Sequence, residues 1–298
     1  MSDPLDIRSE ELSASIAAHG AELQTITDRA GRQYMTDADP RWWAGHAPIL
    51  FPIVGALRDD RYRLDGRDYA MGKHGFARHN DFALVERTES TVRLRLNENP
   101  DTLAQYPFRF ALELDFSLSG WALCVTASVT NHDDRAMPFS FGFHPALAWP
   151  LPGGAAKDAH RVVFEKPEPA PIRRIDPATG LLLPEPQPSP VVDDTLCPTA
   201  DLFEPDALIW DQVESRACTF GAEGGASIHV AFPDTQLLGI WQKPGAHYLC
   251  IEPWHGIADP QGFDGDLREK PEIMELSPGT AREFIMRLTI TPPEDTRT

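Results

Sequence analysis

The segment Tyr248-Leu-Cys-Ile-Glu-Pro-Trp-His-Gly-Ile-Ala-Asp259 decides how the rest of the chain is interpreted. Its first four residues are apolar without alternation, a pattern typical of a β-strand that is buried on both faces. Glu252 follows directly, and Pro253 and Gly256 come after it. Because proline lacks the N–H that a sheet ladder requires, we expect the strand to end near Pro253. This places the Glu252 carboxylate at the end of a core strand, where it faces a cavity.

A carboxylate in such a place seldom lacks a partner or a function. The structural interpretation of Glu252 is a salt bridge from the strand end to an Arg or Lys across the sheet. The chemical interpretation is an acid–base group in a ligand site. On local sequence alone the structural interpretation is the simpler one, and features elsewhere in the chain favour the chemical one.

Outside this segment the chain consists of many short apolar-polar runs separated by Gly and Pro turns. Phe108–Leu118 and Trp121–Thr130 alternate over long spans, and Asp65-Gly66 is a hairpin signal. No segment longer than about ten residues keeps a helical period. The proline-rich stretch Leu151–Pro190 predicts surface loops, because similar strands resume after it. We therefore predict an all-β fold, one large antiparallel β-sandwich domain over residues 1–298.

Charge and composition narrow the classes of partner. The formal net charge of −18 argues against binding to nucleic acid. The first residues lack the basic and apolar regions of a signal peptide, and no run approaches the ~18 apolar residues of a membrane span. The 4 cysteines have no CxxC spacing, and Cys124 and Cys250 lie in apolar runs that predict buried thiols. We expect a cytoplasmic monomer or homodimer that contacts neither nucleic acid nor membrane.

Titratable side chains stand at several predicted strand ends. His144 follows the apolar run Phe139-Ser-Phe-Gly-Phe143 and precedes Pro145, much as Glu252 precedes Pro253. Two titratable groups that are each fixed by a following proline suggest a paired acid and base. The same set includes His74, Arg78, Asp206 and Asp259.

Several segments, in order along the chain, together resemble the aldose 1-epimerase (galactose mutarotase) superfamily. The nearest branch is that of epimerase-like proteins associated with lactose and galactose utilisation. The resemblance implies a β-supersandwich with an open concave sugar site and no cofactor or metal. The segments are Ala47-Pro-Ile-Leu-Phe-Pro-Ile-Val-Gly55, His74-Gly-Phe-Ala-Arg78, Tyr106-Pro-Phe-Arg-Phe110, Phe141-Gly-Phe-His-Pro-Ala146, Asp206-Ala-Leu-Ile209 and Cys250-Ile-Glu-Pro-Trp-His-Gly-Ile-Ala-Asp259.

The resemblance also implies roles for individual residues. His144 resembles the histidine that protonates the sugar ring oxygen. Glu252 resembles the glutamate that the hexose-6-phosphate branch uses as its base. His74 and Arg78 resemble residues that position the substrate, and Asp206 resembles a ligand for sugar hydroxyls.

These residue types suit the interconversion of α and β anomers. A base takes the proton of the C1 hydroxyl, an acid gives one to the ring oxygen, the ring opens, the C1–C2 bond rotates, and the roles reverse on closing. Glutamate and histidine, with ordinary pKa values of ~4.3 and ~6.5, are usable for this near neutral pH. Trp254, Trp241 and Phe76 are candidates for an apolar surface against the sugar.

One departure from the family concerns the base. Galactose mutarotases carry it in a Pro-Gly-Glu segment near the C-terminus, and here that segment reads Ser277-Pro-Gly-Thr280. Among the C-terminal carboxylates Glu252, Glu275 and Glu283, only Glu252 is predicted at a buried strand end, so we expect it to be the base. A non-catalytic sugar-binding protein on the same fold is the first alternative.

Three further alternatives stay open. A hexose-6-phosphate 1-epimerase needs a cluster of cations, and Arg78 is the one cation expected at the site, so we predict a neutral aldose. A glycosidase would pair Glu252 with Asp206 or Asp259 at about 5–10 Å. A cupin-like metal site of His74, His144 and Glu252 is disfavoured because the chain lacks a close histidine pair.

Overall fold

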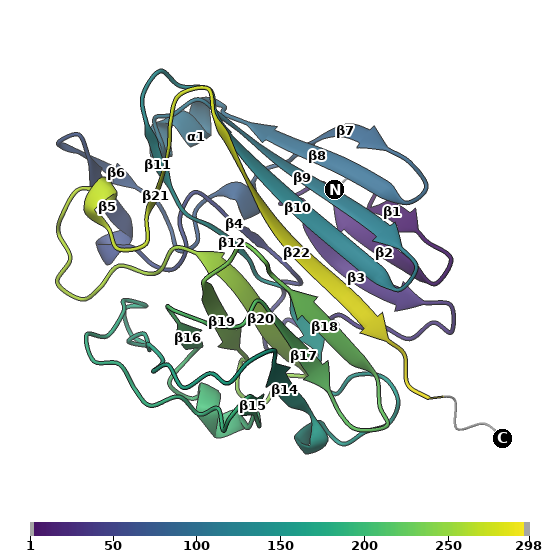
Figure 1. Cartoon of the computed structure of the whole chain (residues 1–298). Helices are drawn as coiled ribbons and strands as arrows, with labels where there is room; N and C mark the ends of the chain where they lie inside the picture. The colour runs from purple at the N-terminus through teal and green to yellow at the C-terminus, as the bar shows by residue number, and fades with distance from the viewer. Residues whose placement is uncertain (1–2, 295–298) are drawn as a thin grey trace.

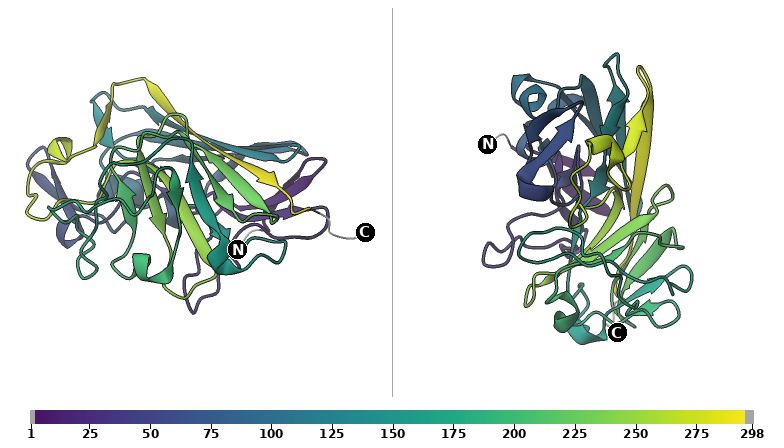
Figure 2. Two further views of the ribbon diagram at one scale, coloured as in Figure 1. Left: turned by 60° about the horizontal axis from the view of Figure 1, so that its bottom comes forward. Right: turned by 90° about the vertical axis from the view of Figure 1, so that its left-hand side faces the viewer.

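The chain forms antiparallel β-sheets, described over residues 3–294 by a computed structural model (Figures 1 and 2). Within that range the largest sheet has nine strands, and the long strands β22, β10 and β9 run side by side in it. In spatial order the strands are β15 (Thr195–Leu196), β14 (Arg161–Phe164), β17 (Ala217–Gly221), β18 (Ser227–Ala231), β22 (Ala281–Thr291), β10 (Ala122–Asn131), β9 (Phe110–Ser119), β8 (Thr91–Asn97) and β7 (Ala83–Arg87).

The second large sheet contains the strand that the sequence singled out, β20. Its order is β16 (Leu208–Trp210), β19 (Leu237–Trp241), β20 (Tyr248–His255), β12 (Phe141–Phe143) and β4 (Ile49–Leu50), and β13 (Ala146–Ala148) also pairs with β20. Smaller sheets are formed by β1 (Leu5–Arg8), β2 (Leu12–Ala17) and β3 (Glu22–Asp28), by β11 (Met137–Phe139) and β21 (Met274–Leu276), and by β5 (Arg61–Leu64) and β6 (Arg67–Ala70).

Helical structure is confined to short pieces in residues 3–294. The α-helix α1 spans Pro100–Gln105, and the Asn99 side chain caps it by accepting the N–H groups of Asp101 and Thr102. The 3₁₀ turns are Arg58–Asp60, Ala77–His79, Lys157–Ala159, Ala200–Phe203 and Leu267–Glu269. Within this range no helix has the length and apolar character needed to cross a membrane.

The two large sheets share one hydrophobic core. Every second residue of β10 is buried, as expected for a strand with one face against the core. Val125 of β10 belongs to the same core cluster as Leu238 of β19 and Ile251 of β20. The predicted antiparallel β-sandwich is therefore confirmed. That cluster includes residues from Ile7 to Ile290.

The prediction that the strand ends near Pro253 is wrong, because β20 continues to His255 and is buried throughout. On one side β20 pairs with β13 up to Cys250 and with β12 from Trp254, so the residues between have no ladder partner there. The Ile251 N–H points to that side and donates to Pro145 O. Two residues on, Pro253 faces the same gap, where its missing N–H costs no ladder hydrogen bond.

The cysteines are all unpaired in this structure. Cys250 is buried, as predicted. Cys124 is half-buried, so the prediction of a fully buried thiol is wrong for it. The reason is its place on β10, where its neighbours Leu123 and Val125 face the core and Cys124 faces outward.

Candidate functional site

The face of β20 that points away from the main core forms the floor of a cavity. Successive strand residues alternate in direction, so Cys250, Glu252 and Trp254 share this face while Leu249 and Ile251 enter the main core. The cavity encloses about 220 Å³, a size that suits a single sugar ring. Six of the residues predicted for the site line it: His74, Arg78, His144, Asp206, Glu252 and Trp254.

Glycines on both neighbouring strands make room for the Trp254 indole. A Cβ on Gly142 of β12 would lie 2.7 Å from Trp254 Cδ1, and a Cβ on Gly239 of β19 would lie 2.7 Å from Trp254 Cη2. Any larger residue at either position would displace the ring from the cavity wall. Of the other aromatic candidates, Trp241 lines the cavity, whereas Phe76 is buried in the main core.

His144 reaches Glu252 because it stands in the gap between β12 and β13. Nε2 of His144 lies 3.1 Å from Oε2 of Glu252, and the two side chains are 9% and 1% exposed. The contact is not aligned as a hydrogen bond. Glu252 Oε2 and His144 Nδ1 are both buried without a hydrogen-bond partner among the described residues. Buried polar atoms left in this state at a cavity are typical of groups that a ligand satisfies.

Aromatic rings surround His144 on the other sides. Its ring centroid lies 5.0 Å from that of Trp43 and 5.9 Å from those of His74 and Trp241. Burial lowers the pKa of His144 to about 3. Burial also raises the pKa of Glu252 well above its usual range, against the opposing effect of the Lys73 charge. Both shifts favour the uncharged forms of the two groups, in which the pair shares one titratable proton.

His74 is fixed by close contact between two backbone segments. The Gly55 N–H donates to His74 Nδ1 at 3.1 Å, so the ring proton lies on Nε2. Burial lowers the pKa of His74 well below its usual value, which keeps the ring neutral. A Cβ on Gly75 would lie 2.3 Å from Phe51 O, so this loop needs glycine at that position. A neutral His74 with its proton on Nε2 is a hydrogen-bond donor for a ligand.

The structure adds a second cation to the one predicted. Lys73 lines the cavity together with Arg78, so the expectation of a single cation is wrong. Arg78 donates to the backbone oxygen of Lys73 at 2.9 Å, which holds the two residues together. Neither side chain has an ion-pair partner within residues 3–294. Sequence reasoning passed over Lys73 although it directly precedes His74.

Asp206 enters the cavity from the segment before β16. Its backbone has a φ of 69°, a strained value that a buried guanidinium helps to hold: Arg174 Nη1 donates to Asp206 O at 2.9 Å. One carboxylate oxygen, Oδ1, accepts the N–H of Ala207 at 2.7 Å. The other oxygen has no protein partner in the part of the chain described, and so remains available to a ligand hydroxyl.

Asp259 does not belong to this site. Its Oδ1 lies 2.6 Å from Nζ of Lys270, and both side chains are buried. Asp259 is absent from the cavity wall, where Ala258 lies instead. A glycosidase pair of Glu252 and Asp259 is therefore not supported by the geometry.

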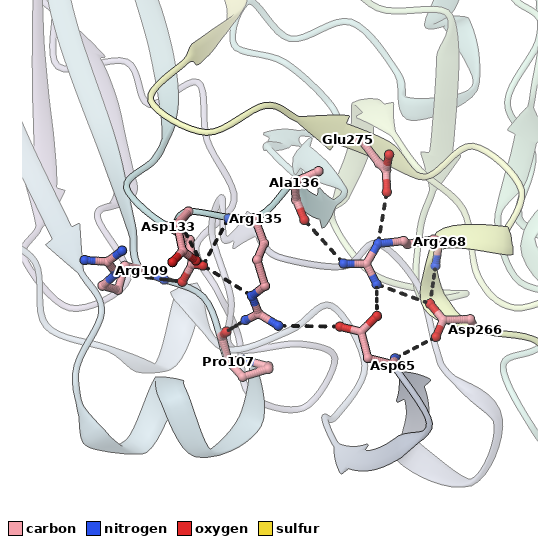
Figure 3. Close-up of polar contacts among 10 residues, drawn as sticks. Asp65, Pro107, Arg109, Asp133, Arg135, Ala136, Asp266, Arg268 and Glu275 are labelled. Atoms are coloured by element: carbon pink, nitrogen blue, oxygen red, sulfur yellow. Dashed lines mark hydrogen bonds and ion pairs between the residues drawn. The ribbon is translucent and has the colours of Figure 1, made fainter.

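The competing C-terminal carboxylates also lie elsewhere. Glu275 is bound to Arg268 at 3.1 Å within a network that includes Asp65 (Figure 3). Glu283 lies on β22 opposite Ser128 and is exposed. Thr280 is exposed as well, and its backbone oxygen accepts the Asn131 N–H at 3.0 Å. Glu252 is thus the one of the three carboxylates that reaches the cavity.

Trp43 is another cavity residue that sequence reasoning missed. It lies in a loop before β4 and contacts His144, Trp241 and Tyr248. The sequence signal for Trp43 is the Trp42-Trp43 pair next to Arg41. Two consecutive tryptophans are unusual in a polar turn unless they cover a ligand or part of the core.

Comparison with known proteins places these features in a family. Residues 5–262 match the family model described as aldose 1-epimerase. The chain is 31% identical over 283 residues to the protein LacX of Lactococcus lactis subsp. lactis, covering 92% of this chain and 95% of that protein.

Two solved structures share the fold closely. A galactose mutarotase related enzyme from Lactobacillus acidophilus superposes with a TM-score of 0.91 at 31% identity, covering 98% of both chains. A galactose mutarotase-like protein from Lactobacillus casei superposes with a TM-score of 0.89 at 30% identity, covering 97% of this chain and 100% of that one.

Proposed function

The chain belongs to the aldose 1-epimerase family, and from this premise and the geometry of the cavity we propose that it interconverts the α and β anomers of a hexose. The observation that carries the proposal is the contact of 3.1 Å between His144 and Glu252 on the cavity floor. A base and an acid this close can act on the C1 hydroxyl and the ring oxygen together, because both oxygens are bonded to C1. The remaining cavity residues supply hydrogen bonds and an apolar wall.

The reaction needs the pair to gain one proton and lose another. In our proposal Glu252 takes the proton of the C1 hydroxyl while His144 gives one to the ring oxygen, and the C1–O5 bond breaks. This step uses the form in which His144 carries the shared proton. Burial favours the form in which Glu252 carries it. The positive charge of Lys73 lowers the pKa of Glu252, which favours the ionised carboxylate, and it also lowers the pKa of His144. A small rotation that aligns the 3.1 Å contact as a hydrogen bond would let the proton move between the two groups.

Other residues orient the sugar. His74 Nε2–H and the free oxygen of Asp206 would bind hydroxyl groups, and each is held by the backbone contacts described above. Trp254 and Trp241 would pack against the C–H surface of the ring. Such positioning contributes to the rate because the reacting atoms are held in line with the acid and base.

The test is exchange of anomers measured by NMR exchange spectroscopy on free aldoses, with chelator-treated protein. Glu252→Gln keeps the shape of the side chain and removes its basicity. We expect it to lower turnover by at least ~10²-fold while changing sugar affinity only modestly. Glu275→Gln is the matched control, since that carboxylate binds Arg268 outside the cavity, and it should behave as wild type.

Two results would contradict the proposal. Normal turnover of Glu252→Gln would mean that the base is misassigned. A wild-type protein that binds sugars but never exchanges their anomers faster than water does would be a sugar-binding protein on this fold.

Hexose 6-phosphates are a second candidate substrate class. The observation that favours them is Lys73 beside Arg78 on the cavity wall, both without a carboxylate partner in residues 3–294. Two such cations suit a phosphate, whereas a neutral aldose leaves them to solvent. Running each aldose beside its 6-phosphate decides between the classes, and a far higher efficiency for the phosphate would overturn the neutral-aldose assignment.

A further inference from the structure

A third chemical group lies beside the proposed acid–base pair. Ligand atoms of His144, Cys250 and Glu252 all lie within 4.8 Å of one another, and all three residues are buried. Cys250 and Glu252 are two residues apart on β20 and therefore share a face of the strand. His144 approaches them from the gap between β12 and β13.

Packing alone does not account for this cluster. The Cys250 side chain belongs to a small apolar group with Ala146, Ala246 and Tyr248, where an alanine or valine would fill a similar space. Glu252 Oε2 and His144 Nδ1 are both buried and without a hydrogen-bond partner in the described chain. The carboxylate oxygen, the thiol and the imidazole all carry lone pairs that can bind a metal ion. No group in the cluster donates a hydrogen bond to the unsatisfied carboxylate oxygen.

The donor types select one class of metal ion. Thiolate, imidazole and carboxylate together suit Zn²⁺, whereas Mg²⁺ and Ca²⁺ prefer oxygen ligands alone. Tetrahedral zinc with ligands at 2.0–2.3 Å holds its donor atoms about 3.3–3.6 Å apart. His144 and Glu252 are already 3.1 Å apart. The widest separations, up to 4.8 Å, must shorten by at most about 1.2–1.5 Å, a shift within the reach of side-chain rotation.

We propose that His144, Cys250 and Glu252 form a binding site for a zinc-class divalent ion, and that its occupancy switches the acid–base pair off. When the ion binds, the thiol of Cys250 and the His144–Glu252 pair each release one proton to solvent. The ion then coordinates the lone pairs with which His144 and Glu252 exchange protons. A water molecule in the cavity would be its fourth ligand. The inhibition rests on the proposed epimerase function, but the binding does not.

The ion supplies no part of the reaction in this proposal. It competes with the sugar for the same two side chains, so the metal-free protein is the active form. A cell would thus slow the activity when free zinc-class ions rise, with Cys250 as the residue that makes the site selective for them over Mg²⁺.

Binding is tested first, without reference to activity. Chelator-treated protein is titrated with Co²⁺, which reports thiolate coordination by a charge-transfer absorption in the near ultraviolet. We expect this absorption at one equivalent, its displacement by Zn²⁺, and no response to Mg²⁺. Cys250→Ser should weaken binding by at least ~100-fold, the upper end of what changes outside the ligand set already cost. Cys197→Ser, which alters an exposed cysteine, is the matched control and should keep the absorption.

Inhibition is tested second, as the ratio of anomer-exchange rates with and without Zn²⁺ in each variant. The ratio should fall in the wild type and in Cys197→Ser, and should stay near one in Cys250→Ser. If Cys250→Ser does not fold, as judged by circular dichroism, Glu252→Gln replaces it in the Co²⁺ titration. It should weaken Co²⁺ binding, because it removes one of the three ligands, and unchanged affinity would overturn the site.

Two outcomes would overturn the site: no charge-transfer absorption in the wild type, or an absorption that persists in Cys250→Ser. A protein that shows the absorption but exchanges no sugar keeps the metal site and refutes the proposed function. A protein that exchanges sugar and binds Co²⁺ through Cys250, but is not inhibited, refutes the switch.

Discussion

Replacing Lys270 with methionine would test the buried ion pair that holds one wall of the cavity. Lys270 Nζ lies 2.6 Å from Asp259 Oδ1, and the side chains are 0% and 5% exposed. Asp259 Oδ2 accepts the Arg58 N–H at 3.0 Å, and the Asp259 N–H donates to Ala56 O at 2.9 Å. The pair thus ties the chain after β20 to the segment that carries Gly55, which lines the cavity.

The magnitude follows from the burial of both groups. Removing one partner of a buried pair costs about 3–5 kcal/mol, because the other charge stays buried without compensation. Asp259 would keep its hydrogen bond from Arg58, so we expect Lys270→Met to lose about 3 kcal/mol of unfolding free energy. The exposed pair Arg63–Asp68, 3.6 Å apart, is the control, and Arg63→Met should cost less than about 1 kcal/mol.

The assay is urea denaturation followed by circular dichroism, with linear extrapolation of the unfolding free energy. The double variant Lys270→Met/Asp259→Asn removes both charges while the asparagine still accepts the Arg58 N–H, so it should recover more than half of the loss. A loss below about 1 kcal/mol in Lys270→Met would refute the reasoning, because a buried carboxylate cannot lose its counter-ion at so small a cost. So would a double variant no more stable than the single one.

The remaining predictions concern histidines. His144→Asn should lower anomer-exchange turnover by ~10²-fold or more with a weaker effect on sugar affinity, and near-normal turnover would move the acid role to His74. Burial lowers the pKa of His255 from 6.5 to about 4. The unfolded chain therefore binds a proton on His255 below pH ~6.5, whereas the folded chain binds it only near pH 4. The unfolding free energy consequently falls as the pH is lowered through this window. His255→Gln should reduce the slope of unfolding free energy against pH by up to about 1.4 kcal/mol per unit, and an unchanged slope would exclude His255 as the source.

Much of the fold could be predicted from local signals. The Asp65-Gly66 turn joins β5 to β6, and the alternation on either side of Gly120 gives the paired strands β9 and β10. These features depend on residues close in sequence, where turn chemistry and side-chain direction decide the outcome. The six predicted residues that line the cavity also follow from motifs at strand ends and in loops.

Features that depend on distant contacts could not be predicted. The continuation of β20 past Pro253 depends on the gap between two partner strands, which no local rule describes. Asp259 lies outside the site because its carboxylate pairs with Lys270. The fold of the intervening loop brings these two residues together. Lys73 was missed because its neighbour His74 carried the family motif, and only the folded loop shows that both face the cavity.

Whether the protein interconverts sugar anomers or only binds a sugar depends on Glu252. The segment in which galactose mutarotases carry their base ends here at Thr280, which is exposed and contacts Asn131 instead of the cavity. A carboxylate at that position would face solvent, so its absence gives no reason to expect a protein that binds sugar without turning it over. What catalysis requires is one group that accepts a proton from O1 and another that gives one to O5. Because both oxygens are attached to C1, a pair 3.1 Å apart at the cavity floor meets that requirement without a third residue.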